Sequence, residues 1–250
     1  LSLRLNILDK YVDKFVIVEA TRDHAGNVKK LNFDKKKFIR FEKKIIYLVI
    51  NDIPEKVENY KKGWSPNFFR ENFHRNTISR ALTDCNPNDL IIISDADEIP
   101  NLNILENTKI NKFAIFSQNH FCYKINLCKS YNWLGSSICY KKYLKSPQWL
   151  RNKRFLRRGF LRKIFFKTQI LKNGGWHFSY LKTPKDMAKK VKAYAHGEHA
   201  DLGNIELIKK NIEMNRLFVS SEDKLFKIPL DDSFPLYIRK NKEILSDWIL

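Results

Sequence analysis

A short apolar run that ends in clustered acids constrains this chain more than any other stretch. Residues 90–93 read Leu-Ile-Ile-Ile, and Asp95, Asp97 and Glu98 follow within five positions. A continuous apolar run of this length is typical of a strand buried on both faces, and Pro100 prevents it from continuing. Because ligands of open α/β sheets bind beyond the carboxyl ends of the strands, the acids lie where a ligand site is expected. A plain acidic turn after a core strand remains the alternative.

The spacing of these acids favours a metal site. Three carboxylates this close repel one another unless a positive charge lies among them. Divalent ions such as Mg²⁺ and Mn²⁺ prefer carboxylate oxygens, and such an ion can carry a diphosphate group. We therefore predict Asp95 and Asp97 as metal ligands, with Mn²⁺ or Mg²⁺ as the cofactor.

The composition narrows the kinds of protein that this chain can be. The 250 residues are 43% hydrophobic and 13% aromatic, which is enough for a real core in an α/β domain. The formal net charge of +20 favours anionic partners: nucleotide phosphates, nucleic acid or an anionic membrane face. The four cysteines form no C-x₂-C pair, which argues against zinc and suits a reducing compartment. No apolar run approaches the roughly 20 residues of a membrane span and no signal peptide is visible, so we expect a cytoplasmic protein.

The order of the expected elements indicates an α/β fold. Before Pro100 the patterns predict a helix over 1–9, strands at 15–18 and 45–50, a helix over 67–83 and the strand at 90–93. Strands this hydrophobic suit a mixed, mostly parallel sheet flanked by helices. After Pro100 we expect strands at 112–125 and 136–143, a glycine-hinged loop at 173–180, and helices over 183–195 and 204–217. The amphipathic pattern that opens at Leu1 leads us to expect a strand ahead of it.

Side chains outside the acid turn also suit a ligand site. On the helix over 67–83, Arg75 and Asn76 lie about one turn from Glu71, where an arginine can reach the acids or a phosphate. Trp176 offers a flat ring for stacking on a sugar or base, and His177 follows it. An ordinary surface ion pair and a core tryptophan beside a turn are the structural alternatives.

Two later stretches concentrate charge. His196 and Glu198 lie two residues apart and can supply a metal ligand and a general base, unless they form only a polar helix end. The segment Arg151–Lys163 interleaves basic residues with Phe and Leu. Such a segment can lie on an anionic membrane or contact nucleic acid phosphates, and a solvated face is the simplest alternative.

Taken in order, five stretches of the chain resemble glycosyltransferase family 17, which contains β-1,4-mannosyl-glycoprotein 4-β-N-acetylglucosaminyltransferases. The similarity extends over most of residues 1–201, and the last two stretches are its most specific part. The stretches are Leu3-Arg4-Leu5-Asn6, Phe15-Val16-Ile17-Val18-Glu19-Ala20, Arg70-Glu71 with Arg75-Asn76, Ile93-Ser94-Asp95-Ala96-Asp97-Glu98-Ile99-Pro100, and Gly175-Trp176-His177-Phe178-Ser179-Tyr180.

The resemblance implies a single GT-A-like domain over residues 1–250, with a nucleotide-binding half at 1–110 and a helical, acceptor-side half at 111–250. It implies an inverting transfer of a sugar, expected to be N-acetylglucosamine, from a UDP-sugar to a glycan or glycolipid hydroxyl. A strand that relatives carry ahead of Leu1 is absent from the sequence. Peripheral contact with the inner face of a membrane through the basic segment is a further expectation, and no nucleic acid partner is expected.

The resemblance also assigns roles to residues. Glu19 matches an acid that contacts the nucleoside, and Asp95 and Asp97 match the Asp-x-Asp motif that holds ribose, sugar and metal. With the observations above, the expected donor-binding residues are Glu19, Arg75, Asn76, Asp95 and Trp176. The expected metal ligands are Asp95, Asp97 and His196. Glu198 is the first candidate for the general base and His177 the second.

Two other functions fit parts of the pattern. A phosphohydrolase of the haloacid dehalogenase type also ends a strand in Asp-x-Asp, with Asp95 as nucleophile and Asp97 as acid. Such motifs usually lie on the first strand and continue with Thr or Val, whereas two strands precede this one. A basic module for nucleic acid or anionic lipid would explain the charge but not the clustered acids.

Overall fold

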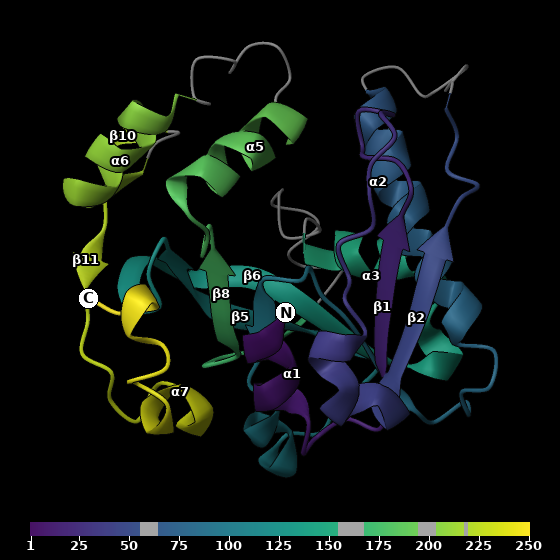
Figure 1. Ribbon diagram of the computed structural model, residues 1–250. Helices are drawn as coiled ribbons and strands as arrows, with labels where there is room; N and C mark the ends of the chain where they lie inside the picture. Colours follow the sequence, from purple (N-terminus) through teal and green to yellow (C-terminus); the bar gives the residue numbers. More distant parts are fainter. Residues whose placement is uncertain (56–64, 155–167, 195–203, 218–219) are drawn as a thin grey trace, which may run out of the picture.

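The computed structural model describes residues 1–55, 65–154, 168–194, 204–217 and 220–250. The fold is mixed α/β. Figure 1 shows two strands on one flank, a larger curved sheet beside them, and helices around both. Helix α1 (Ser2–Leu8) lies between the two parts, and Leu5, Ile7 and Leu8 are its buried residues.

The smaller sheet has two parallel strands. β1 (Phe15–Ala20) pairs with β2 (Ile45–Ile50) along its full length, from Phe15 opposite Ile45 to Ala20 opposite Ile50. The connection between them contains a 3-10 helix over Lys36–Lys44 that buries Phe38 and Phe41. The continuous apolar runs predicted both strands correctly, but burial on both faces is wrong. Most residues of β1 and β2 are half-buried and Val49 is exposed, because a sheet of two strands leaves part of each strand uncovered.

Helix α2 (Pro66–Asn76) follows β2 and begins where local chemistry dictates. Ser65 is the N-cap, its hydroxyl accepts a hydrogen bond from the Phe68 amide, and Pro66 occupies the first helical position. A 3-10 turn over Thr77–Ala81 continues the chain toward β3. The predicted helix over 67–83 is therefore an α-helix for its first part only.

The larger sheet has seven strands, in the order β11-β6-β5-β8-β4, with β3 also paired to β6 and β7 to β5. Among the described strand pairs of this sheet, β5–β7 and β5–β8 are parallel and the other four are antiparallel. The predicted mixed sheet is therefore confirmed, and the prediction that it is mostly parallel is wrong. The cause is the short connection between two long strands, β5 and β6, which makes them an antiparallel hairpin. The bounds are β3 Leu90–Ile93, β4 Glu98–Pro100, β5 Phe113–Cys122, β6 Leu127–Tyr140, β7 Gln169–Leu171, β8 Gly175–Ser179 and β11 Phe226–Lys227.

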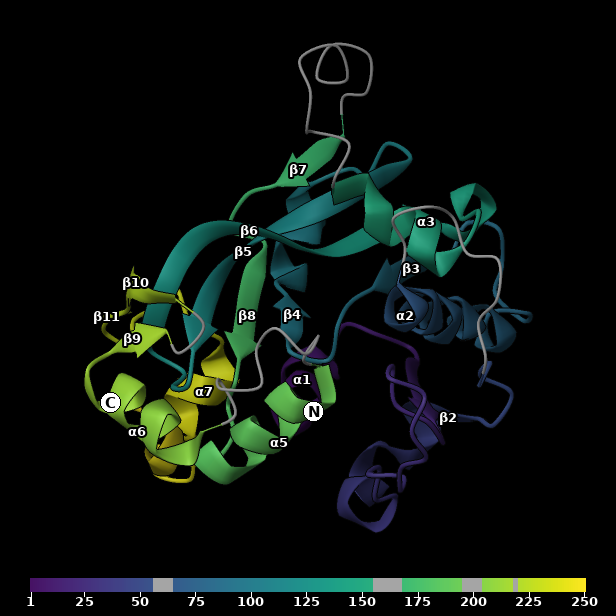
Figure 2. The same cartoon turned by 90° about the horizontal axis from the view of Figure 1, so that it is seen from above.

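Strand β6 joins distant parts of the molecule. Its start pairs with β11 and its end pairs with β3, and Figure 2 shows it curving from one end of the molecule to the other. Helix α3 (Pro147–Asn152) follows it and lies beside β3 and α2. This path brings α3 next to the acid turn that follows β3.

The predicted glycine-hinged loop at 173–180 is wrong, because Gly175–Ser179 form the fully buried strand β8. Gly175 has φ +123°, and a β-carbon there would lie 2.2 Å from the Ile99 carbonyl oxygen on β4. Gly175 is therefore needed because it lets β4 and β8 approach closely, and it does not serve as a hinge. Along β8 the side chains alternate, so Trp176 and Phe178 face one way and His177 and Ser179 the other.

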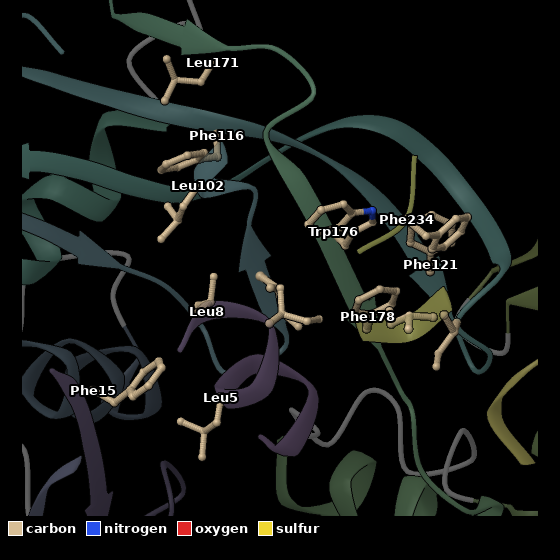
Figure 3. Packing of buried hydrophobic residues seen from close by; sticks show 14 of the residues in the cluster. Leu5, Leu8, Phe15, Leu102, Phe116, Phe121, Leu171, Trp176, Phe178 and Phe234 are labelled. Carbon is tan, nitrogen blue, oxygen red and sulfur yellow. The ribbon is translucent and has the colours of Figure 1, made fainter. Parts of the chain in front are cut away.

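The hydrophobic core lies on the Trp176 side of β8. Figure 3 shows Trp176 and Phe178 near Phe121 and Phe234, with Leu5 and Leu8 of α1 on the way to β1. The remaining α-helices of the described residues are α5 (Pro184–Tyr194), α6 (Ile205–Glu213) and α7 (Leu236–Lys240). The predicted helix over 183–195 agrees with α5, whereas the one over 204–217 is too long, because Arg216 and Leu217 form strand β9, and α7 was not predicted. A two-strand ribbon, β9 (Arg216–Leu217) with β10 (Ser220–Lys224), follows α6. Within the described ranges no helix is both long and apolar enough to span a membrane.

Candidate active site

A groove of about 1770 Å³ lies between the two sheets. Its apolar walls come from β1 and β3, and in the described part of the chain these strands pair only with β2 and β6, respectively. Its polar end gathers side chains from the loop after β1, α2, the turn after β3, and β8. These are His24, Glu71, His74, Arg75, Asp95, Asp97 and His177.

The three acids after β3 have different environments. The side chains of Asp95 and Asp97 are 40% and 31% exposed, respectively, and both line the groove. Glu98 begins β4 and its side chain is only 1% exposed. The cluster is therefore two groove-facing carboxylates and one buried carboxylate.

Arg151 of α3 stabilises this turn from the buried side, opposite the groove. Its guanidinium donates to both carboxylate oxygens of Glu98, at 2.7 and 2.5 Å, to Asp95 Oδ2 at 2.6 Å, and to the Gly135 carbonyl at 2.6 Å. The arginine is fully buried, so these charge-assisted bonds form away from water. Trp133 Nε1 adds a hydrogen bond to Glu98 Oε1 at 3.1 Å, and Arg4 donates to the Glu98 carbonyl.

The charges in this network set the ionisation of Asp95. Burial by itself would raise the pKa of Asp95, but the positive charges of Arg151 and Arg75 outweigh it and hold the pKa below its usual value. Burial by itself would lower the pKa of Arg151, but the carboxylates of Glu98 and Asp95 outweigh this effect and raise the pKa above its usual value. Asp95 is thus a carboxylate at neutral pH.

Arg75 lies against the acid turn, as its position on the helix predicted. Its Nη2 donates to Glu71 Oε1 at 2.7 Å and to Asp95 Oδ1 at 3.1 Å, and its Nη1 donates to Gln148 of α3. Each oxygen of Asp95 therefore accepts from a different arginine. Asn76 instead ties α2 to α3, since its side-chain oxygen accepts from the Gln148 amide at 3.0 Å.

Asp97 lies beside the predicted histidine. Its Oδ1 is 3.5 Å from His177 Nε2, and its backbone carbonyl accepts from the Phe178 amide at 2.8 Å. The His177 ring is packed between neighbours and is 9% exposed. Asp95, Asp97, Arg75 and His177 are thus the predicted site residues that come together at the groove.

Glu19 is not among the residues that line the groove. Its carboxylate accepts hydrogen bonds from Lys29 Nζ, the Asn32 and Phe33 amides, the Asn32 side chain and the Tyr47 hydroxyl, at 2.6–3.0 Å. Burial by itself would raise the pKa of Glu19, but the bonds from Lys29, Asn32 and Phe33 lower it to about 2. In the described structure Glu19 organises the loop after β1.

Trp176 also lies away from the groove. Its Nε1 donates to the Ser233 carbonyl at 3.0 Å, and its ring is 7% exposed within the core. It contributes to a separate pocket of about 360 Å³ near α1 and α7. The alternation along β8 explains this, because adjacent residues of a strand face opposite sides.

Two predicted residues, His196 and Glu198, lie outside the described residues, as does most of the predicted basic segment Arg151–Lys163. The expectation for Arg151 itself is wrong, because this residue is buried against Glu98 and is not part of a solvated basic face. The sequence pattern favoured a surface segment because arginines are rarely buried unless they are paired, and the pairing is invisible in the sequence.

The described residues hold no group of three His, Cys, Asp or Glu side chains arranged to bind a metal. Both oxygens of Asp95 accept from arginines, and Glu98 is sealed in the interior. Asp97 remains as a groove-facing carboxylate. One or two carboxylates together with substrate phosphate oxygens are a ligand set that Mg²⁺ accepts, so the residues present fit an ion that arrives with a diphosphate.

Sequence reasoning missed four polar residues around the site: His120, Trp133, Arg151 and Ser179. His120 on β5 and Ser179 on β8 both contact His177, and Trp133 and Arg151 both contact Glu98. Had residues 175–179 been assigned to a strand, the two-residue period would have placed Ser179 on the face of His177. The other three could not be found this way, because their partners are distant in the sequence.

The polar end of the groove combines carboxylates with a firmly held arginine, an arrangement suited to a charged ligand. The sequence model of glycosyltransferase family 17 matches residues 1–234. The chain belongs to this family, and it is therefore a glycosyltransferase, a class that moves a sugar from a nucleotide-sugar donor to a glycan acceptor. No curated protein and no solved structure matches the chain.

Proposed function

We propose that this glycosyltransferase transfers N-acetylglucosamine from UDP-N-acetylglucosamine to a hydroxyl of a glycan or glycolipid, with inversion at the anomeric carbon and with Mn²⁺ or Mg²⁺. The observation that supports it best is the acid turn at the groove. Asp97 faces the groove beside Asp95, and Arg75 lies 3.1 Å from Asp95. The diphosphate of a UDP-sugar carries two negative charges, which a cationic side chain and a carboxylate-bound metal ion would both neutralise.

The proposed roles follow from this geometry. Arg75 is held by Glu71, Asp95 and Gln148, which fixes a positive charge at the groove before any donor arrives. Such a fixed charge favours the departing diphosphate without reorganisation cost. Asp97 would contact the metal ion, which supplies neutralisation of the leaving diphosphate when bound. Both oxygens of Asp95 already accept hydrogen bonds from arginines, so Asp95 would contribute by holding Arg75 at the groove.

The attacking hydroxyl must lose a proton as the new bond forms, so a base must lie on the acceptor side. Glu198 and His177 are the two residues offered for this role. His177 lines the groove next to Asp97. Glu198 lies outside the described residues, so its candidacy rests on its residue type and on the family resemblance.

A phosphohydrolase that uses Asp95 as a nucleophile is a poorer fit to the same turn. A nucleophilic carboxylate needs an accessible oxygen, and both oxygens of Asp95 accept hydrogen bonds from arginines. Release of phosphate from a simple phosphate ester, without any nucleotide sugar, would support that alternative. The basic binding module predicts salt-dependent binding that survives loss of both aspartates.

The experiment is a transfer and donor-hydrolysis assay with UDP-N-acetylglucosamine and Mn²⁺. We expect Asp97→Ala to lose activity by roughly a hundredfold or more, as expected for loss of a charged group at the reacting centre. Glu198→Gln should lose transfer more than donor binding. Asp232→Ala is the matched control, because Asp232 is an exposed acid paired with Arg239. Full activity in Asp97→Ala would reject the proposed site.

The choice of donor and metal has its own test. A thermal-shift screen of UDP-, GDP- and CMP-sugars, each with Mn²⁺ and with EDTA, should raise the melting temperature only for the bound donor and only with metal. A shift for UDP-N-acetylglucosamine that persists in EDTA would reject the metal. A shift for another nucleotide sugar alone would reject the donor.

A further inference from the structure

The connection between β1 and β2 concentrates positive charge on one surface. It contains the 3-10 helix Lys36–Lys44, the basic helix, and residues 35–44 hold six basic residues and a single acid, Glu42. Four of the basic side chains are exposed and form no ion pair within the described part of the chain. They are Lys36, Lys37, Arg40 and Lys43. Their charge is therefore available to an anionic partner outside the molecule.

The period of the basic helix separates a buried row from an exposed surface. A 3-10 helix has about three residues per turn, so side chains three positions apart lie in one row. Phe38 and Phe41 form the inner row and are 9% and 5% exposed, whereas Ile39 between them is 68% exposed. A kink at Phe38 precedes the regular part, in which Arg40 and Lys43 share an outer row. The exposed surface thus combines cations with an aliphatic side chain.

The basic helix is firmly attached to the smaller sheet. The ring of Phe38 stacks on that of Phe33, with 5.6 Å between centroids and 2° between the planes. The ring of Phe41 meets that of Phe15 on β1 edge-on, with 6.5 Å between centroids. Because these contacts fix the helix in advance, a partner can bind its outer surface without the cost of ordering a segment.

The side chains of this surface favour a lipid bilayer over nucleic acid. Proteins bind single-stranded nucleic acid through aromatic rings that stack on bases, and both phenylalanines of the basic helix are buried. An anionic bilayer instead attracts lysine and arginine to its headgroups and accepts apolar side chains just beneath them. A single exposed isoleucine is common on a monomeric protein, so the inference depends on the unpaired cations beside Ile39.

We propose that the basic helix docks this protein on an anionic membrane surface, with Ile39 inserted among the lipid headgroups and the four unpaired cations facing lipid phosphates. Lys14 lines one end of the groove and donates to the Lys43 carbonyl at 2.9 Å, so the docked helix would bring that end of the groove close to the bilayer. A glycolipid acceptor would then be near the enzyme. That consequence rests on the proposed function, whereas the docking itself does not.

The charge requirement is tested with vesicles and without any sugar donor. In a sedimentation assay, the wild type should bind vesicles of equal parts phosphatidylcholine and phosphatidylglycerol and leave pure phosphatidylcholine vesicles unbound. Lys36→Gln combined with Lys43→Gln should weaken this binding roughly 25-fold, which is about fivefold for each lysine close to the surface.

The matched control removes the same charge elsewhere. Lys109→Gln combined with Lys172→Gln changes two exposed lysines next to β7. Figure 2 shows β7 on the side of the molecule opposite the basic helix, which precedes β2. Charges farther from the bilayer than the Debye length are screened, so at about 0.1 M salt this control should bind within about threefold of the wild type.

The apolar requirement separates a bilayer from other anionic partners. Ile39→Asn keeps the charge and should weaken vesicle binding roughly tenfold, because it removes the side chain that enters the bilayer. Ile244→Asn is the matched control and should bind as the wild type does, since Ile244 is 78% exposed but lies outside the basic helix. All of these substitutions are at exposed positions, so the melting temperatures should equal that of the wild type.

Three results would overturn the proposal. Equal losses in the two lysine pairs would mean that the net charge of +20, and not this surface, drives vesicle binding. Unchanged vesicle binding by Ile39→Asn would rule out insertion. Binding of a single-stranded oligonucleotide in place of vesicles, lost in the Lys36 and Lys43 pair, would assign the surface to nucleic acid. Absence of sugar transfer would reject only the proposed function, because the vesicle assay contains no donor.

Discussion

Replacing Arg151 by methionine should destabilise the protein more than any other change at the acid turn. The arginine and Glu98 are both 1% exposed in their side chains. Arg151→Met removes both bonds to Glu98 and the bond to Asp95 while leaving the acids in place. The buried carboxylate of Glu98 then keeps only Trp133 Nε1 as a side-chain donor among the contacts described.

The expected cost follows from this loss. Breaking a buried ion pair by removing one partner costs about 3–5 kcal/mol, because the other charge stays buried and uncompensated. For a domain of this size, 1 kcal/mol corresponds to about 2–4 °C in melting temperature, so we expect a decrease of roughly 6–20 °C. Methionine is similar in length, so lost packing should add little.

The assay is urea denaturation followed by circular dichroism, performed on a double-mutant cycle. Arg151→Met combined with Glu98→Gln has no buried charge, and the glutamine oxygen can still accept from Trp133. We expect the double variant to regain at least half of the stability that Arg151→Met loses. The interaction energy of the cycle should therefore be about 2 kcal/mol or more.

Two results would refute this reasoning. A loss below about 1 kcal/mol in Arg151→Met would mean that the pair behaves as a surface pair does. A double variant less stable than the single would mean that the lost contacts, and not the stranded charge, set the cost. Arg80→Met is the control, because Arg80 pairs with Asp52 at the surface, and its melting temperature should match the wild type.

Three further predictions test single groups. Glu19 has a pKa of about 2 against an ordinary 4.5, so its stabilisation is complete above pH 4.5 and is lost as the pH falls to 2. The free energy of unfolding of the wild type should exceed that of Glu19→Gln at pH 6 and converge with it near pH 2; parallel pH curves would contradict this. His120 takes up a proton in the unfolded chain below about pH 6.5 and in the folded chain only near 3, so relative to His120→Gln the wild type should lose about 1 kcal/mol per pH unit from pH 6 to 4. If the difference in free energy of unfolding between wild type and His120→Gln did not change with pH, the folded chain would leave His120 in contact with water. Arg75→Lys keeps the charge but loses the planar fork that reaches Glu71, Asp95 and Gln148, so the KM for the donor should rise roughly tenfold. An unchanged KM would remove Arg75 from the donor site.

The sequence predicted local structure well where a single segment carries the signal. The predicted strands at 15–18, 45–50 and 90–93 and the predicted helix start at 67 agree with β1, β2, β3 and α2, because apolar runs and helical periods are local signals. The glycines at 174–175 misled the prediction. Both are needed for close backbone approaches: a β-carbon on Gly175 would lie 2.2 Å from the Ile99 carbonyl oxygen of β4, and one on Gly174 would lie 2.7 Å from the Ser117 amide nitrogen of β5. A segment's own residues do not report how closely a distant strand approaches.

The site shows the same division. The sequence alone determined that acids follow the strand at 90–93 and that Arg75 lies one helical turn from Glu71, because strand ends and helix periods are local properties. Only the tertiary structure decided which acid is buried and which faces the groove. Arg151 meets Glu98 across 53 residues and His120 meets His177 across 57, and such pairs form because the long strands β5 and β6 bring distant segments together. Burial and pairing are properties of that assembly, and they give different roles to neighbouring acids: Asp97 faces the groove and Glu98 is buried against Arg151.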